Sequence, residues 1–309
     1  MKISKNNGHN IKNFALAAPF LGRVPRLFMP MPSGKRPINI ILDAESGHEK
    51  LRVELAEGLD SSDQSVLLVL IALAGIDSKI ISSANTGPKS SLLWNDLNVS
   101  FDAETEQCAL VTTTQTDILK ILGWNRSGHE YNRLKKCLNR LKNVSLLISK
   151  GERQWRSGLL SYLINNTSAI GGEDIVYVVL NSKIAKALDG GQYARICLEE
   201  RRSLSSNIAQ LLHTWLSFNI NHGYHLSPYI DTLVQRIWGE PCKLHQSKSK
   251  TEYEKKEIRR KRAEIVTALK QLSELDGWRV RFNDKVGSNR QVEVKRLRVI
   301  NGAVEKSNP

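Results

Sequence analysis

Asparagine and arginine recur at helical spacing in the segment HEYNRLKKCLNRLK, residues 129–142. Asparagine forms paired hydrogen bonds with adenine and arginine forms them with guanine, whereas lysine chiefly contacts phosphate. A helix over this segment gathers its leucines on one side and exposes a polar set on the other. This set is Asn132, Arg133, Lys136, Asn139 and Arg140, with Lys135 beside them. We therefore predict that this face reads a DNA sequence, and a solvated charged face is the alternative.

A second basic segment, residues 253–273, carries seven lysines and arginines against three glutamates, a net charge of +4. Its apolar side chains, from Ile258 to Leu272, form one stripe of a helix. The residues that we expect to contact DNA are Lys256, Arg259, Arg260, Lys261 and Arg262. The segment contains no asparagine, so phosphate contacts should dominate. Arg262 lies close to the apolar stripe, where covering the core is the alternative to contacting DNA.

Each basic segment follows a short helical pattern and precedes a β-hairpin pattern. The short helices are predicted over residues 114–124 and 227–238, and the hairpins turn at residues 151–152 and 287–289. Helix, connector, basic helix and hairpin is the order of a winged helix-turn-helix, whose second helix enters the major groove. The fold class that we predict is therefore α+β, with two tandem winged-helix domains.

Basic residues flank both predicted hairpin turns, where they would reach the DNA backbone beside a recognition helix. They are Lys150, Arg153 and Arg156 in the first unit, and Lys285 and Arg290 in the second. Basic turns also serve solubility, and this alternative stays open.

Changes of pattern along the chain predict its domain limits. Residues 1–37 hold five of the nine prolines, interleaved with basic side chains, so we expect a flexible basic arm. Residues 38–200 begin with strand patterns and contain the apolar stretch SVLLVLIALAG, a helix that we place at the centre of the first winged-helix domain. Residues 201–309 are predicted to form the second winged-helix domain.

The 309 residues carry 45 lysines and arginines against 31 acidic residues, a formal net charge of +14. A polyanion is the expected partner, and we predict double-stranded DNA rather than a membrane. The four cysteines have no close spacing, which indicates reduced thiols in a bacterial cytoplasm rather than metal ligands. The sequence lacks the phosphate-loop, paired-carboxylate and paired-histidine motifs of common catalytic sites. We therefore expect no cofactor, no metal and no enzymatic activity.

Four stretches give the chain a family resemblance. They are GGQYARICLEE, AQLLHTWL, IDTLVQRIWGE and RRKRAEIVTALKQLSELDGWRV, at residues 190–200, 209–216, 230–240 and 259–280. In these stretches the chain resembles the RepC replication initiators of IncQ-type broad-host-range plasmids. The resemblance implies an initiator that binds direct repeats, called iterons, in the plasmid origin through two winged-helix domains. It also implies opening of adjacent AT-rich DNA and recruitment of a plasmid-encoded helicase and primase, without catalytic activity of its own.

The sequence leaves two other functions open. A transcriptional repressor with the same domains would bind an operator in a promoter, and a palindromic target would identify it. A nuclease or nickase would use a nucleophilic tyrosine or metal-binding carboxylates. The sequence also leaves open whether the active form is a monomer or a dimer.

Overall fold

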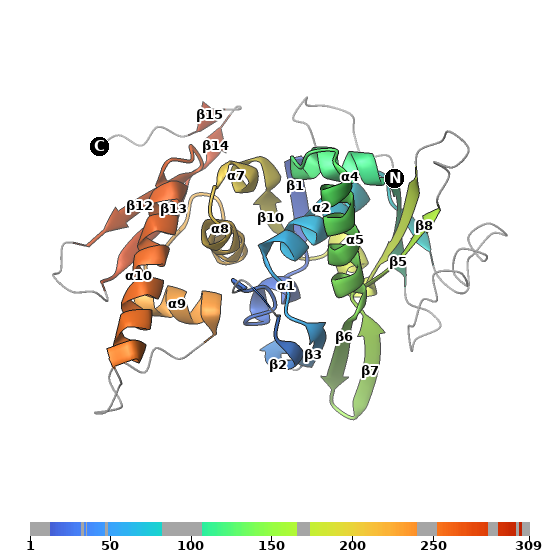
Figure 1. Cartoon of the computed structure of the whole chain (residues 1–309), viewed down its shortest axis with the longest axis horizontal. Helices are drawn as coiled ribbons and strands as arrows, with labels where there is room; N and C mark the ends of the chain where they lie inside the picture. The colour runs from blue at the N-terminus through green and yellow to red at the C-terminus, as the bar shows by residue number, and fades with distance from the viewer. Residues whose placement is uncertain are drawn as a thin grey trace.

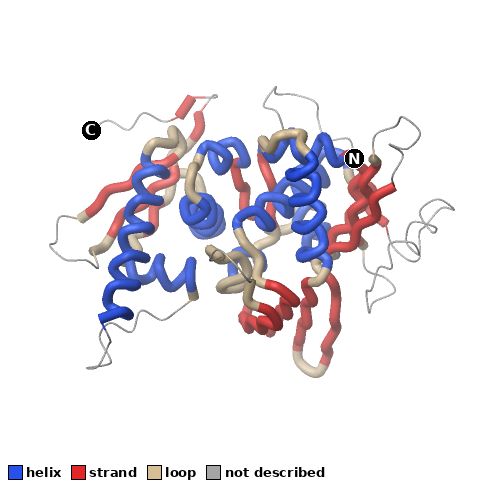
Figure 2. The backbone as a smooth tube through the Cα atoms, viewed as in Figure 1, coloured by secondary structure: helices blue, strands red, loops and turns tan. Residues whose placement is uncertain are grey.

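The computed structural model describes residues 13–31, 34, 36–46, 49–81, 107–165, 174–239, 252–283, 290–300 and 303–304. They form a mixed α+β fold with helices at its centre and sheets at its sides (Figure 2). The helices are α1 (Phe20–Arg23), α2 (Ser61–Asp77), α4 (Gln115–Leu122), α5 (Gly128–Lys142), α6 (Ser182–Leu188), α7 (Leu198–Ser203), α8 (Asn207–Asn219), α9 (Ile230–Trp238) and α10 (Glu252–Ser273). The strands are β1 (Phe14–Ala17), β2 (Ile38–Ser46), β3 (Glu49–Glu57), β4 (Lys79–Ile81), β5 (Cys108–Thr114), β6 (Val144–Lys150), β7 (Arg153–Gly158), β8 (Leu160–Asn165), β9 (Ile175–Leu180), β10 (Ala194–Cys197), β11 (His225–Leu226), β12 (Trp278–Phe282), β13 (Val292–Arg296), β14 (Val299–Ile300) and β15 (Ala303–Val304).

The apolar helix α2 is the centre of the first half, where it packs against α4, α5 and β1 (Figure 1). Its start is fixed by a capping box. The Asp60 carboxylate accepts hydrogen bonds from the backbone N–H groups of Ser62 and Asp63, and the Asp63 carboxylate accepts one from the N–H of Asp60. The sequence predicts a cap over residues 61–63 and an end at Gly75. The cap is instead Asp60, so α2 begins at Ser61, and the helix continues two residues past Gly75 to Asp77.

Two four-stranded antiparallel sheets flank these helices, in the orders β2-β3-β6-β7 and β4-β5-β9-β8. The β6–β7 hairpin directly follows α5, and its last pair joins Lys150 to Arg153. The chain then crosses from β7 into β8, which belongs to the other sheet. The side-chain amide of Asn181 donates to the carbonyl of Gly158 at 2.9 Å and holds this crossing in place. The sequence after the turn at residues 151–152 therefore forms two strands in separate sheets, β7 and β8, and only β7 belongs to the hairpin.

The second half consists of α8, α9 and α10 with the three-stranded sheet β11-β13-β12. Strand β11 lies between α8 and α9 in the sequence and pairs with β13, and the β12–β13 hairpin follows α10. Gly239 ends α9 in the left-handed conformation, with a φ of 72°. The apolar stripe of α10 packs against α8 and α9, and Ile265, Leu269 and Leu272 are fully buried, as the helical spacing predicts.

Residues 14–31 form part of the core, which corrects the prediction of a flexible arm in this segment. Strand β1 pairs with β10, with Phe14 opposite Cys197, and α1 packs against α8. The buried side chains of the segment include Ala15, Ala17, Leu21, Val24, Leu27 and Phe28. Apolar residues between the prolines anchor the segment, although its prolines and arginines alone suggested a solvated arm. Residues 1–12 of the predicted arm lie outside the described part of the chain.

The two halves share one hydrophobic cluster, and α8 contacts α1 and α2 as well as α10. A polar cluster around Glu200 of α7 joins them further. The Glu200 carboxylate accepts hydrogen bonds from His213 Nε2 of α8 at 2.8 Å and from Trp278 Nε1 of β12 at 2.9 Å. The domain boundary that we predict near residue 200 falls within this continuous core and stays a prediction.

The buried His213 side chain should make stability depend on pH. Burial lowers the pKa of His213 although Glu200 opposes the shift, and its Nδ1 atom has no hydrogen-bond partner in the described part of the chain. An unfolded histidine titrates near pH 6.5, at about its ordinary pKa, so the unfolded state binds more protons below that pH. We expect His213 to decrease the free energy of unfolding by up to about 1.4 kcal/mol per pH unit as the pH falls from 6.5 to its folded pKa. Urea denaturation at pH 7, 6 and 5 measures this slope.

The His213→Gln variant should show a smaller slope than the wild type. The matched control is His225→Gln, which changes an exposed histidine and should keep the wild-type slope. An unchanged slope in His213→Gln would contradict the assignment of a neutral buried ring.

Candidate nucleic-acid interface

Helix α5 presents part of the polar face that the sequence predicts. Gly123 ends α4 in the left-handed conformation, and the Ser127 hydroxyl caps α5 by accepting a hydrogen bond from the N–H of Glu130 at 3.4 Å. The side of α5 that faces the core buries Leu134, Cys137, Leu138 and Leu141. The opposite side exposes Asn132, Lys136 and Asn139, and Lys135 is half-buried beside them.

The two asparagines on this face differ in their hydrogen bonding. Asn139 Oδ1 accepts a hydrogen bond from the Tyr162 hydroxyl at 2.6 Å. Recognition of adenine uses the amide oxygen and nitrogen together, so Asn139 must leave Tyr162 before it can pair fully with a base. Asn132 makes no side-chain hydrogen bond within the described residues and is exposed. It is therefore the better placed of the two for base recognition.

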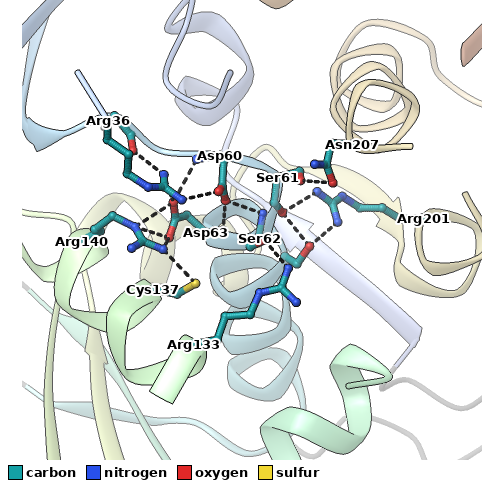
Figure 3. A network of polar contacts seen from close by, with 12 residues as sticks. Arg36, Asp60, Ser61, Ser62, Asp63, Arg133, Cys137, Arg140, Arg201 and Asn207 are labelled. Carbon is teal, nitrogen blue, oxygen red and sulfur yellow. Dashed lines mark hydrogen bonds and ion pairs between the residues drawn. The ribbon is translucent and has the colours of Figure 1, made fainter. Parts of the chain in front are cut away.

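Arg140 and Arg133 point toward α2 rather than away from the protein (Figure 3). Arg140 Nε and Nη2 lie 2.9 and 2.8 Å from Asp63 Oδ1, and the side chains of this pair are 12% and 0% exposed. The guanidinium of Arg133 lies 4.0 Å from the centre of the Trp124 ring and donates to the Ser62 hydroxyl at 2.7 Å. Both arginines thus hold α5 to neighbouring elements in this structure, and base contacts by them stay a prediction.

This inward direction follows from the position of Cys137 between the two arginines. Residues 133, 137 and 140 are spaced at i, i+4 and i+7, so they form one stripe of α5. Cys137 on this stripe is buried. The one signal in this segment was the cysteine between the two arginines, and it did not identify Asp63 as the partner of Arg140.

The carboxylates at the start of α2 form a coupled cluster. Burial raises the pKa of Asp60, but the charge of Arg36 and the backbone N–H donors outweigh burial and lower it below its ordinary value. Burial raises the pKa of Asp63, whereas Arg140 opposes the shift. Burial also raises the pKa of the Cys137 thiol, which therefore stays protonated at neutral pH. Arg36 pairs with both aspartates, so the charges within the cluster are matched.

The β6–β7 hairpin carries the three basic residues predicted for the first wing. Lys150 and Arg153 face each other at the last pair of the hairpin, next to its turn. Arg156 is exposed and lies 3.0 Å from the carboxylate of Glu54 on β3. Figure 1 shows this hairpin extending beyond the end of α5, which is the position of a wing.

Helix α10 exposes fewer of its basic residues than the sequence predicts. Lys256 and Arg259 are exposed, and Arg260 is exposed but pairs with Glu257 and Glu264 on the same helix. The hydrogen bond with Glu257 raises the pKa of Arg260, and the charges of Glu257 and Glu264 add to this although burial opposes it, so Arg260 stays charged.

Two of the residues expected to contact DNA from α10 are buried. Lys261 is 6% exposed, with its ammonium 5.8 Å from the centre of the Trp238 ring. Arg262 is 7% exposed and forms two hydrogen bonds with the Asp231 carboxylate of α9, at 2.6 and 2.7 Å. Both lie under the packed α9, which covers this flank of α10. Arg262 therefore lies beside the apolar stripe, as its position in the sequence indicates, but its guanidinium is buried in an ion pair with Asp231.

The second hairpin adds basic residues that the sequence analysis missed. Arg290 of the predicted set lies 4.5 Å from the centre of the Phe282 ring, and Lys285 lies outside the described residues. On the outer face of the sheet, His225, Lys295 and Arg279 stand opposite one another on three strands. The available signal was the alternation of basic and apolar residues in RVRF, and of polar and apolar residues in VEV and Lys295, because side chains lie on one face of a strand at every second position.

The described residues contain no group of three or more histidine, cysteine, aspartate or glutamate side chains that could hold a metal ion. Cys108, Cys137 and Cys197 are buried, and Cys242 lies outside the described residues. Within the same ranges, no helix is both long enough and apolar enough to cross a membrane.

Comparison with known proteins gives a family match and two similar folds. The family model described as replication protein C (RepC) matches residues 15–289. A crystal structure of selenomethionine derivatives of domains 2 and 3 of RctB has a TM-score of 0.52 and 12% sequence identity, over 91% of this chain and 99% of that chain. A second crystal structure of RctB domains 2-3 has a TM-score of 0.52 and 11% identity, over 90% and 96% of the two chains. None of the curated proteins matches the chain in sequence.

Substitutions of Lys136 and Arg140 should separate DNA contact from structural support. Lys136→Ala removes an exposed charge, so it should weaken duplex binding about equally on all sequences and lower the salt slope of log K by about 1. Arg140→Ala leaves the Asp63 carboxylate buried without this partner, so the free energy of unfolding should fall by about 3 kcal/mol. Fluorescence anisotropy at several salt concentrations and urea denaturation measure the two effects.

Lys136→Ala serves as the control for stability, and its free energy of unfolding should equal that of the wild type. Arg140→Ala with wild-type stability would contradict the burial of the Arg140–Asp63 ion pair.

Proposed function

The chain belongs to the replication protein C (RepC) family of replication initiators, and we propose that it starts plasmid replication by binding direct repeats in the origin as duplex DNA. The observation that carries the proposal is the repetition within one chain of a short helix, a basic helix and a β-hairpin. Helices α4 and α5 with β6–β7 form one copy, and α9 and α10 with β12–β13 form the other.

We further propose that each copy is a winged-helix domain. In the second half, the order α8, β11, α9, α10, β12, β13, with β11 added to the edge of the hairpin sheet, supports this assignment. In the first half, α2 takes the place of α8, and α5 takes the place of α10. In the first half the β6–β7 hairpin extends a sheet with β2 and β3, whereas in the second half the β12–β13 hairpin pairs with β11, which lies between the first two helices. The first domain is therefore the more elaborate copy.

The exposed side chains of the two basic helices suit different tasks on DNA. Asn132 and Lys136 of α5 offer a base-reading amide beside a phosphate-binding ammonium, whereas Lys256 and Arg259 of α10 offer two positive charges and no amide. Neutralised phosphates release counterions, so affinity should fall steeply with salt. Two readers joined in one chain also raise affinity, because binding of the first increases the effective concentration of the second.

Direct repeats suit this arrangement better than a palindrome. A palindromic operator matches a two-fold symmetric dimer, whereas tandem copies in one chain have no such requirement. A transcriptional repressor that binds a promoter operator is the alternative, and its target would be a palindrome.

The later steps of initiation follow from the family resemblance. We propose that bending and unstacking of AT-rich DNA beside the repeats open the strands, at a cost of a few kcal/mol per kinked step. The opened DNA would then receive a plasmid-encoded helicase and primase in the bacterial cytoplasm. The protein would act by binding, without an enzymatic step.

Footprinting on the plasmid origin tests the target. We expect periodic protection over direct repeats at physiological salt with random competitor DNA. Asn132→Ala should weaken binding to the specific site by about 1–3 kcal/mol and leave binding to random duplex unchanged, because it removes a base contact. Gel-shift titrations on both DNAs measure the difference.

Asn219→Ala, which changes an exposed asparagine of α8, is the control and should bind both DNAs like the wild type. Protection of a single palindrome in a promoter would favour the repressor. Equal losses on specific and random DNA would show that Asn132 does not read bases.

Incubation of supercoiled origin DNA with the protein and Mg²⁺ or Mn²⁺ tests the proposal that it does not cleave DNA. We expect the DNA to stay supercoiled and unnicked on agarose gels. Nicking that is lost on substitution of one tyrosine or carboxylate would overturn the proposal.

A further inference from the structure

A cavity of about 240 Å³ lies where the start of α2, the α4–α5 turn and the α7–α8 segment meet. A single ordered water needs only about 10–15 Å³ by the same kind of measure, so the cavity has room for a larger molecule. Residues from both halves line it, and they include Ser62, Trp124, Arg133, Arg201, Arg202 and Asn207. Three of these six side chains carry a positive charge.

Arg201 brings an uncompensated charge to the wall of the cavity. It is 3% exposed, and within the described residues each of its hydrogen bonds goes to a neutral acceptor. The acceptors are the hydroxyls of Ser65 and Thr214, the amide oxygens of Gln64 and Gln210, and the carbonyl of Ser61. Burial lowers the pKa of Arg201 to about 9, with the Asp60 charge opposing the shift. Buried charges in proteins normally have a partner of opposite charge.

Other arginines around the start of α2 have a carboxylate partner, in contrast to Arg201 (Figure 3). Arg36 and Arg140 approach the first turn of α2 from one side and pair with Asp60 and Asp63. Arg133 and Arg201 approach from the other side and meet the hydroxyl of Ser62 and the carbonyl of Ser61. The two aspartates thus balance Arg36 and Arg140, and Arg133 has a contact with Glu130, whereas Arg201 has no carboxylate contact among the described residues. The cavity lies beside Arg133 and Arg201.

Arg133 and Arg202 stand closer to solvent and suit direct contact with a ligand. The Arg133 side chain is 40% exposed, and its one carboxylate contact is with Glu130 of the same helix at 3.3 Å. Arg202 is exposed and reaches across the α4–α5 turn to donate to the carbonyl of Ile121. Guanidinium groups bind phosphate in paired, charge-assisted hydrogen bonds, and Ser62 and Asn207 add neutral donors.

The remaining wall of the cavity is apolar. Val69, Ile121, Leu122 and Leu198 line it beside the Trp124 ring. An apolar wall with a few convergent polar groups is typical of sites for small organic ligands. The charged wall and the apolar wall together suit a molecule with a phosphate group and an uncharged organic part.

We propose that this cavity binds a small phosphate-bearing organic molecule, of the size of a nucleoside monophosphate, between α2 and α5 on one side and α7 and α8 on the other. The phosphate supplies the negative charge that Arg201 lacks and is held directly by Arg133 and Arg202. Because the ligand contacts both halves, its binding restrains the position of α5 relative to α8. The site does not depend on the proposed function.

Calorimetric titration of the full chain with sodium phosphate and with adenosine monophosphate tests this site, at an ionic strength kept constant with sodium chloride. We expect saturable binding of one equivalent, tighter for adenosine monophosphate than for phosphate. At ten times the dissociation constant, the Tm should rise by about 3 °C. Arg133→Gln and Arg202→Gln should each weaken binding about 10-fold, because each removes a charge-assisted contact.

Arg52→Gln is the matched control, since it removes an equal charge from an exposed site on β3 and should leave the titration unchanged. The proposal is overturned if no saturable binding occurs or if Arg52→Gln weakens it equally. Binding of phosphate but not of adenosine monophosphate would overturn the proposal that the apolar wall contacts an organic group of the ligand. Loss of duplex binding in Arg133→Gln and Arg202→Gln, without binding of either small anion, would assign the cavity to a DNA phosphate instead.

Discussion

The first half of the molecule depends on two aspartates at the start of α2. Asp60 caps the helix, and the Asp63 carboxylate is fully buried against Arg140 of α5. A buried carboxylate is strongly unfavourable unless positive charges and hydrogen-bond donors surround it. Arg36, from the segment before β2, completes the cluster by pairing with both aspartates. The start of α2 therefore brings α5 and the amino-terminal segment to fixed positions, and it determines which face of α5 remains exposed.

The second half uses a similar contact. Asp231, in the first turn of α9, forms two hydrogen bonds with Arg262 of α10. In both halves an arginine of the basic helix is bound by an aspartate from the first turn of another helix, which makes it a structural residue. Basic charge in such a helix is thus divided between support of the fold and contact with a partner. This division explains why the exposed basic faces are smaller than the charge of each segment suggests.

Periodicity and capping signals in the sequence were sufficient to predict the basic helices, the hairpins and the buried stripe of α10. They failed where a residue's partner is distant in the chain. A helical pattern cannot distinguish an arginine that faces water from one that faces a buried carboxylate, and Asp63 is 77 residues from Arg140. The prediction that Lys261 contacts DNA failed for a related reason, because Lys261 is buried by the packing of α9 against α10. The apolar residues among the prolines of residues 14–31 were visible, but their partner strand, β10, is far away in the sequence.

The pairing of β1 with β10 also bears on how the protein folds during synthesis. Phe14 pairs with Cys197, so the first strand has no partner until roughly 180 more residues have left the ribosome. At about 5–20 residues per second, that delay is on the order of 10–40 seconds. During this time β1 lacks its strand partner, although α2, against which it packs, emerges much earlier, and unpaired strands of this kind are prone to aggregate. The amino-terminal segment is therefore the part of the chain that we expect to depend most on a chaperone as it emerges.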